Sequence, residues 1–192
     1  MRYRHVIWDW NGTLLDDAWL CVEIMNGLLG PRGLAPLTME RYQEVFDFPV
    51  VEYYRRLGFD FQKESFEKLG TDFIVEYEKR RLECDLQPGA REALAAIERA
   101  GLTQSVLSAY RQDTLEELVD HFGLRRYFVA LAGLEDHYAA GKTGNARKLI
   151  AGLPHAPREV LLIGDTVHDH EVARAIGANC VLVPCGHQSR AR

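Results

Sequence analysis

Five short apolar runs, separated by segments with helical periodicity, constrain the fold of this 192-residue chain more than any other feature. An apolar run of three to five residues without alternation is typical of a strand that is buried on both faces of a parallel sheet. Strands of this kind separated by helices indicate repeated strand–helix–strand crossovers. The sequence therefore predicts an α/β fold with a doubly wound parallel sheet. Its strands are expected at residues 6–8, 103–107, 127–131, 160–163 and 180–183.

One long segment, residues 16–84, breaks this alternation. It holds no convincing strand, but its apolar residues recur at helical spacing in three stripes. The stripes start at Trp19, Val50 and Phe66. We therefore expect an α/β core formed by residues 1–15 and 85–192, and a small α-helical cap formed by residues 16–84 after the first strand. Carboxylates, Pro88 and Gly89 interrupt the pattern at residues 15–17 and 84–88, where we expect the hinges.

Charge and composition exclude several classes of function. The net charge of −5 argues against binding to nucleic acid or to an anionic membrane, because both attract proteins with dense basic patches. No apolar run approaches the roughly 20 residues that span a bilayer, and the N-terminus has no apolar stretch typical of a signal peptide. The four cysteines lack zinc-ligand spacing. We expect a cytoplasmic protein with reduced thiols, either a monomer or a weak homodimer.

Polar residues follow the predicted strands at the edge where ligands bind in an open parallel sheet. Asp9 follows the first run and Ser108 the second, Lys142 comes before a helix, and Asp165 and Asp169 follow the fourth run. A carboxylate nucleophile, a hydroxyl, an ammonium and two further carboxylates can together transfer a phosphoryl group through an aspartyl phosphate. We expect Asp9 to attack phosphorus, Ser108 and Lys142 to hold the phosphate, and the other two aspartates to complete an all-oxygen site suited to Mg²⁺.

These residues resemble, in order, the four motifs of the haloacid dehalogenase superfamily. The first is the string DWNGT at residues 9–13, the second and third are Ser108 and Lys142, and the fourth is GDTVHD at residues 164–169. The insertion between the first two motifs is similar to the helical cap of the phosphoglycolate phosphatase-like branch, so the resemblance covers nearly the whole chain. It implies a Rossmann-like core with the first strand at its centre, and a cap that closes over a small phosphorylated metabolite.

The resemblance also implies the roles of single residues. The Mg²⁺ ligands are expected to be Asp9, the backbone carbonyl of Asn11 and Asp165, with Asp169 supporting the metal directly or through water. Thr13 resembles the residue that orders the nucleophile loop beside the substrate.

Asn11 departs from the family pattern. Most phosphatases of the family carry an aspartate there, which protonates the leaving group and then activates water, and an amide can do neither. We therefore expect a slow Mg²⁺-dependent phosphatase. The alternatives are a regulatory module that binds phosphate and Mg²⁺ with little turnover, and a hydrolase of the same family that acts on another bond, such as carbon to halogen.

Several neighbouring residues have simpler interpretations. Asp16 and Asp17 are expected to cap the first cap helix, although either can partly replace the missing acid. Lys142 is preferred to Lys148 because it is expected in a GKTG loop from which an ammonium can reach inward. Residues 46–49 occupy the place of the family's substrate-specificity loop; with Asp47 as their one charge, they give little support for a strongly anionic substrate.

Overall fold

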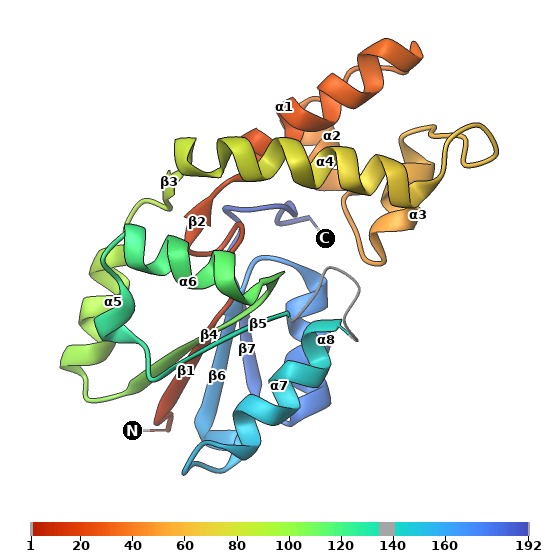
Figure 1. The fold of residues 1–192 in the computed structure, drawn as a ribbon. Helices are drawn as coiled ribbons and strands as arrows, with labels where there is room; N and C mark the ends of the chain where they lie inside the picture. Colours follow the sequence, from red (N-terminus) through yellow and green to blue (C-terminus); the bar gives the residue numbers. More distant parts are fainter. Residues whose placement is uncertain (1, 135–140, 192) are drawn as a thin grey trace.

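The computed structural model describes residues 2–134 and 141–191 and contains a five-stranded parallel sheet with strand order β5-β4-β1-β6-β7 (Figure 1). The first strand pairs in parallel with both β4 and β6, so it lies at the centre of the sheet. The predicted fold class is confirmed. The strands are β1 (His5–Trp8), β4 (Thr103–Arg111), β5 (Ala130–Leu134), β6 (Val160–Gly164) and β7 (Asn179–Leu182).

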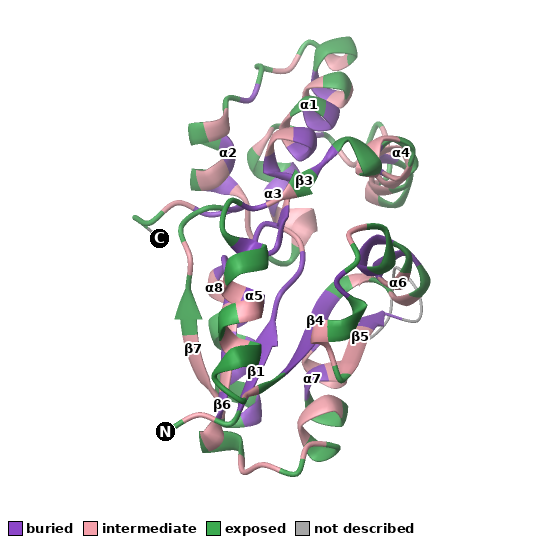
Figure 2. Ribbon diagram, turned by 90° about the vertical axis from the view of Figure 1, so that its left-hand side faces the viewer, coloured by how far each residue is buried: buried purple, intermediate pink, exposed green. Residues whose placement is uncertain are grey.

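Side chains of β1 alternate between two hydrophobic cores because successive residues of a strand point to opposite faces. Val6 and Trp8 belong to the larger core, with Leu94 and Leu115, whereas Ile7 belongs to the smaller one. Helices α5 (Ala90–Arg99) and α6 (Gln112–His121) cover the first face, and α7 (Gly141–Ala151) and α8 (Val167–Ile176) cover the second. Figure 2 shows buried residues along β1 and β4 and more exposed ones along β7, the edge strand.

The third strand lies further along the chain than predicted. Residues 127–131 were expected to form it, but β5 starts at Ala130, and a 3-10 turn covers Arg125–Tyr127. Tyr127 and Phe128 pack against the larger core from this turn. Their apolar character therefore reflects burial in a turn, which a short apolar run does not distinguish from burial in a strand.

Four helices between β1 and α5 lie over the carboxyl end of the sheet (Figure 1). They are α1 (Ala18–Leu29), α2 (Met39–Val45), α3 (Val50–Arg56) and α4 (Phe66–Arg80). Two strands that the sequence did not predict, β2 (Leu15–Asp16) and β3 (Asp85–Leu86), pair antiparallel where the chain enters and leaves this helical segment. The division into two domains stays a prediction.

Membrane-spanning helices are not found in the part of the chain that the structure describes, since none of its helices is both long enough and apolar enough.

Candidate active site

Three buried aspartates meet at the carboxyl end of the sheet. Asp9 follows β1, Asp165 follows β6, and Asp169 lies in the first turn of α8. Each offers a carboxylate oxygen, and these oxygens all lie within 4.8 Å of one another. Asp169 also closes the start of its helix, because its Oδ2 accepts hydrogen bonds from the backbone N–H (3.0 Å) and the hydroxyl (2.7 Å) of Thr166. Asp169 therefore caps its helix and also belongs to the cluster.

Lys142 supplies a buried positive charge to this cluster. Its ammonium donates to Oδ1 of Asp9 and, at 2.5 Å, to Oδ1 of Asp169. The prediction that Lys142 lies in a GKTG loop is wrong, because α7 already starts at Gly141. Ala146 of this helix packs in the smaller core. The packed helix therefore carries Lys142 and directs its side chain toward the carboxylates.

The cluster carries more negative than positive charge. Burial raises the pKa of Asp9 to about 8; Lys142 opposes this shift, whereas the carboxylates of Asp169 and Asp165 add to it. Burial also disfavours the charged form of Asp169, but Lys142 outweighs it and holds the pKa of that carboxyl below its usual value. Three carboxylates therefore face one ammonium in a buried site. Such a set of hard oxygen donors suits a divalent cation such as Mg²⁺.

Gly12 and Thr13 let the loop after β1 pack tightly against Asp165. The Thr13 hydroxyl lies 3.2 Å from Oδ2 of Asp9 and 3.2 Å from Oδ1 of Asp165, which ties the two carboxylates together. Gly12 has a φ of +75°, and a Cβ there would lie 2.4 Å from Oδ2 of Asp165. A side chain at residue 12 would therefore be strained and would displace a member of the cluster.

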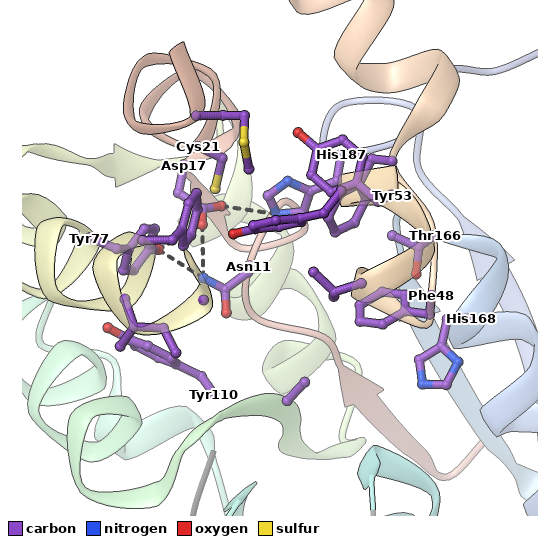
Figure 3. Close-up of a pocket in the computed structure, with 18 of the residues that line it drawn as sticks. Asn11, Asp17, Cys21, Phe48, Tyr53, Tyr77, Tyr110, Thr166, His168 and His187 are labelled. Carbon is purple, nitrogen blue, oxygen red and sulfur yellow. Dashed lines mark hydrogen bonds and ion pairs between the residues drawn. The ribbon is translucent and has the colours of Figure 1, made fainter. Parts of the chain in front are cut away.

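The Asn11 side chain is held by hydrogen bonds to Asp17 and Tyr77 beside the cluster (Figure 3). Its Nδ2 donates to Oδ2 of Asp17 at 2.8 Å and to the Tyr77 hydroxyl at 2.9 Å. The same Asp17 carboxylate accepts hydrogen bonds from the backbone N–H of Gly12 (2.8 Å) and from the Tyr77 hydroxyl (2.7 Å). Both amide hydrogens of Asn11 are therefore engaged.

Asp17 does not cap the first helix as we predicted. It occupies the N-cap position of α1, but its side chain makes no capping hydrogen bond. Its carboxylate turns instead toward Asn11, Gly12 and Tyr77, and it is 1% exposed. Asp17 is thus a buried charge at the edge of the site.

His187 is a site residue that sequence reasoning missed. It lies in the segment after β7, and its backbone N–H donates to Oδ2 of Asp165 at 2.5 Å. Its Nε2 lies 3.4 Å from Oδ1 of Asp17, and its Nδ1 lies 2.7 Å from the Tyr42 hydroxyl. Burial favours the neutral imidazole, but the Asp17 carboxylate outweighs it and raises the pKa of His187 to about 9. Nothing in the sequence around His187 indicates this placement.

Ser108 is not joined to the cluster by any contact within the described residues. The sequence placed it just after a strand, but β4 continues to Arg111, with an irregular register between Leu107 and Arg111. The Ser108 hydroxyl is buried and accepts a hydrogen bond from the backbone N–H of Tyr110 at 3.0 Å. A phosphate-binding role for Ser108 stays a prediction.

The carboxylate cluster opens into a cavity of about 550 Å³ that is also lined by residues of the helices above the sheet. Asp9, Asn11, Lys142, Asp165 and Asp169 line one end, and side chains of α3 and α4 line much of the rest. This volume falls in the usual range for small-molecule sites, about 300–1,000 Å³. The arrangement can bind a small molecule with its reacting group at the cluster.

Comparison with known proteins agrees with this geometry. The sequence model of the family described as "Haloacid dehalogenase-like hydrolase" matches residues 6–183. Tyrosine-protein kinase PtkA of Mycobacterium tuberculosis is 27% identical over 184 residues, and the alignment covers 95% of this chain but 62% of that protein. The solved structure of PtkA has a TM-score of 0.80 at 25% identity and covers 98% of this chain and 87% of that chain. The chain therefore spans about 62% of the length of the mycobacterial kinases that it matches.

Two similar proteins are named as phosphatases. N-acetylmuramic acid 6-phosphate phosphatase of Pseudomonas aeruginosa is 28% identical over 194 residues, which covers 97% of this chain and 84% of that protein. Phosphoglycolate phosphatase of Synechococcus elongatus is 26% identical over 191 residues, which covers 96% of this chain and 85% of that protein.

Proposed function

Because this chain belongs to the haloacid dehalogenase-like hydrolases, we propose that it is a Mg²⁺-dependent phosphatase of small phosphorylated molecules. The resemblance seen in the sequence is thereby confirmed at the level of the family. The observation that carries the proposal is the buried cluster of Asp9, Asp165 and Asp169 with Lys142 at its centre. The names of the phosphatase relatives support a phosphate monoester as the substrate.

Asp9 is the proposed nucleophile. Its carboxylate oxygen forms a bond to phosphorus while the bond from phosphorus to the leaving oxygen breaks, and an aspartyl phosphate results. Water then attacks the phosphorus, which releases inorganic phosphate and restores the carboxylate. Lys142, which contacts Asp9, would balance the charge of the phosphoryl oxygens during both steps.

The chain's own donor set fits Mg²⁺. Asp9, Asp165 and the backbone carbonyl of Asn11 would hold the ion, and Asp169 would support it. A bound Mg²⁺ would neutralise charge on the phosphoryl oxygens. Thr13 orients two of these ligands, since its hydroxyl lies 3.2 Å from an oxygen of each carboxylate.

Asn11 limits the proposed reaction. Both hydrogens of its amide are engaged by Asp17 and Tyr77, and an amide has no proton to give to a leaving group. General acid and base catalysis contributes about 10²- to 10⁴-fold in rate, so both the first step with a poor leaving group and the later attack of water are expected to be slow. With a good leaving group, a burst of product followed by slow turnover would report an accumulated aspartyl phosphate.

Phosphate release from a panel of phosphate monoesters, with and without Mg²⁺, tests this function. We expect release that chelation abolishes and Mg²⁺ restores. Ca²⁺ should restore it less, because its larger and looser coordination shell misplaces the phosphate. Equal rescue by both ions would contradict the metal assignment, and no release and no phosphoenzyme with any ester would refute the phosphatase function.

A second candidate function is phosphoryl transfer from the aspartyl phosphate to an acceptor other than water. Two observations favour it: the missing carboxylate at Asn11 would leave the attacking water without a base, and similar mycobacterial proteins are named as tyrosine-protein kinases. Incubation with radiolabelled ATP, Mg²⁺ and a tyrosine-containing peptide tests it. A labelled peptide that the Asp9→Asn variant fails to produce would support this candidate.

A further inference from the structure

The cavity beyond the carboxylate cluster is walled by aromatic side chains. They come from α2, from the segment between α2 and α3, from α3 and α4, and from β4. Within this wall the ring centroids of Phe46 and Phe48 lie 5.5 Å apart, and those of Phe48 and His168 lie 4.7 Å apart. Figure 3 shows Phe48 beside His168. The lining Phe and Tyr rings are Tyr42, Phe46, Phe48, Tyr53, Tyr54, Phe66, Phe73, Tyr77 and Tyr110.

Most polar groups of this wall are already bonded to the protein. The hydroxyl of Tyr77 donates to Asp17 at 2.7 Å, that of Tyr110 to Glu78 at 2.5 Å, and that of Thr71 to the carbonyl of Glu67 at 2.7 Å. The exceptions are on α3: the buried hydroxyl of Tyr53 has no hydrogen-bond partner among the described residues, and that of Tyr54 makes no hydrogen bond to them. One such hydroxyl can bond a single polar substituent, but a sugar carries several hydroxyls that would lose their bonds to water.

The charges of the lining disfavour a second anionic group on the ligand. Its basic side chains each have an acidic neighbour: Lys142 bonds to Asp9 and Asp169, Nε2 of His187 lies 3.4 Å from Asp17, and Nδ1 of His168 lies 3.4 Å from Glu171. The described lining residues include no arginine, and two glutamates, Glu67 and Glu78, also line the cavity, the second of them paired with Arg81 at 3.0 Å. A carboxylate or second phosphate on the ligand would meet no unpaired cation there.

The chemistry at Asn11 selects the same kind of ligand. A phenol ionises with a pKa of about 10, as tyrosine does, whereas an alkanol is a far weaker acid, close to water itself. When the Asp9–phosphorus bond forms and the phosphorus–oxygen bond to a phenol breaks, the electron pair stays on a phenolate oxygen. That oxygen leaves without a proton from the protein and takes one from water afterwards. An alkoxide would need the acid that Asn11 does not provide.

We propose that the substrates of this site are aryl phosphate monoesters, whose aromatic leaving group packs between Phe46, Phe48 and the rings of α3 and α4. This proposal rests on the proposed phosphatase function and specifies its substrate class. In the second step, water attacks phosphorus, the bond to Asp9 breaks, and the proton lost by water ends on inorganic phosphate.

Binding of inert analogues tests the cavity without any turnover. Benzylphosphonate is an analogue of phenyl phosphate in which a methylene replaces the ester oxygen. In the same way, 3-phosphonopropionate is the inert analogue of a small phosphate ester that carries a carboxylate. Calorimetric titration of the chain with each compound in Mg²⁺ should show that benzylphosphonate binds at least about 10-fold more tightly. Equal affinities, or tighter binding of the carboxylate compound, would overturn the proposal even if the protein proves to be a phosphatase.

Turnover of matched esters tests the leaving group. Phenyl and cyclohexyl phosphate have similar sizes but different leaving-group acidities. We expect the first step, measured as kcat/KM or as the rate of the initial burst, to be at least ~10²-fold faster with phenyl phosphate. Equal rates would overturn the proposal. If neither ester nor any other is hydrolysed, the phosphatase function fails, and the phosphonate titrations still decide the preference of the cavity. Comparing O-phosphotyrosine with a phosphotyrosyl peptide separates a small-molecule source of aryl phosphate from a protein source.

A pair of variants links the preference to the aromatic wall. Phe48 lines the cavity and is 36% exposed, so Phe48→Ala should leave the fold intact. Phe61 is a half-buried aromatic residue of the same helical segment and is not among the lining residues, which makes Phe61→Ala the matched control. The ratio of the affinities for benzylphosphonate and 3-phosphonopropionate should fall by about 2- to 12-fold in Phe48→Ala, the effect expected for the loss of one aromatic pair. It should stay unchanged in Phe61→Ala. An unchanged preference in Phe48→Ala would count against the proposal.

Discussion

Exchanging the side chains of Asn11 and Asp17 should move a carboxylate toward the phosphate without changing the net charge. In the wild type, Nδ2 of Asn11 donates to Oδ2 of Asp17 at 2.8 Å, and Asp17 is 1% exposed. The double variant Asn11→Asp/Asp17→Asn keeps one amide and one carboxylate in contact but reverses their positions. It therefore supplies the acid and base that Asn11 lacks, at a smaller cost in stability than the single substitution.

The single variant Asn11→Asp should be clearly less stable. It loses a hydrogen bond to a charged group, which contributes about 1.5–3 kcal/mol. It also brings two carboxylates together, and at an effective dielectric constant of about 20 two unit charges roughly 4 Å apart repel by about 4 kcal/mol. The folded pair will therefore bind a proton with a raised apparent pKa, whereas the unfolded chain will not. Because the folded state then binds more protons, the loss of stability should grow as the pH rises, to about 5–6 kcal/mol at pH 8.

Urea unfolding at pH 6 and pH 8, with all four members of the double-mutant cycle, measures this effect. We expect a favourable coupling energy between residues 11 and 17 of at least about 2 kcal/mol at pH 8. The pairing of His187 with Asp17 is lost in the exchange, so the double variant should recover most but not all of the wild-type stability. A coupling energy near zero would show that the contact between Asn11 and Asp17 does not hold this part of the site.

Turnover of the same variants tests the chemical half of the reasoning. The double variant should hydrolyse cyclohexyl phosphate at least ~10²-fold faster than the wild type, because its carboxylic acid can protonate the alkoxide. The rate of the first step with phenyl phosphate should increase much less. The initial burst should shrink, because the same carboxylate activates water and less aspartyl phosphate then accumulates. If cyclohexyl phosphate is no faster with either of the two variants that contain Asn11→Asp, another group already supplies the proton, and the reasoning about Asn11 is refuted.

Three further outcomes are expected. Asp9→Asn should abolish phosphate release and phosphoenzyme formation. Its free energy of unfolding should stay at or above that of the wild type, because the substitution removes one charge from a buried cluster of carboxylates. The control variant Asp120→Asn, at an exposed carboxylate, should retain activity. Burial lowers the pKa of His5 from 6.5 to about 4. The contribution of neutral His5 to the free energy of unfolding is therefore fully present above pH 6.5 and should fall by about 3 kcal/mol as the pH drops toward 4. Urea unfolding should show that His5→Gln lacks this part of the pH dependence. Helices α1–α4 should exchange amide hydrogens more slowly with Mg²⁺ and a phosphate analogue than without them; identical exchange would contradict a closing cap.

The strands and the carboxylates at their ends were readable from the sequence because both follow from local patterns. Residues 6–8 are apolar without alternation, as a strand covered on both faces must be, and Asp9 comes next. The same logic applies to β6 and Asp165. The pattern failed where apolar residues pack against the core without forming a strand. Tyr127 and Phe128 are the example, because they pack against the larger core at a 3-10 turn. Two-residue strands such as β2 and β3 are too short to leave any pattern.

The residues around Asn11 were not readable because their contacts join distant parts of the chain. Asp17 and Asn11 are close in sequence, but Tyr77 comes from α4, and His187 comes from the segment after the last strand. The position of Asp17 just before a helix predicted a capping role, because an aspartate at that position commonly caps the helix.

The position of the Asp17 carboxylate changes how the asparagine is understood. An aspartate at residue 11 would face a buried carboxylate 2.8 Å away, whereas an asparagine donates to it. The Asp17 charge in turn is balanced by His187, whose backbone N–H donates to Asp165, a proposed metal ligand. Asn11 is thus one part of a connected polar network that reaches the proposed Mg²⁺ ligands, and replacing it alone leaves the rest of that network adapted to an amide. For this reason the missing acid should be restored by exchanging residues 11 and 17 together, and not by substituting residue 11 by itself.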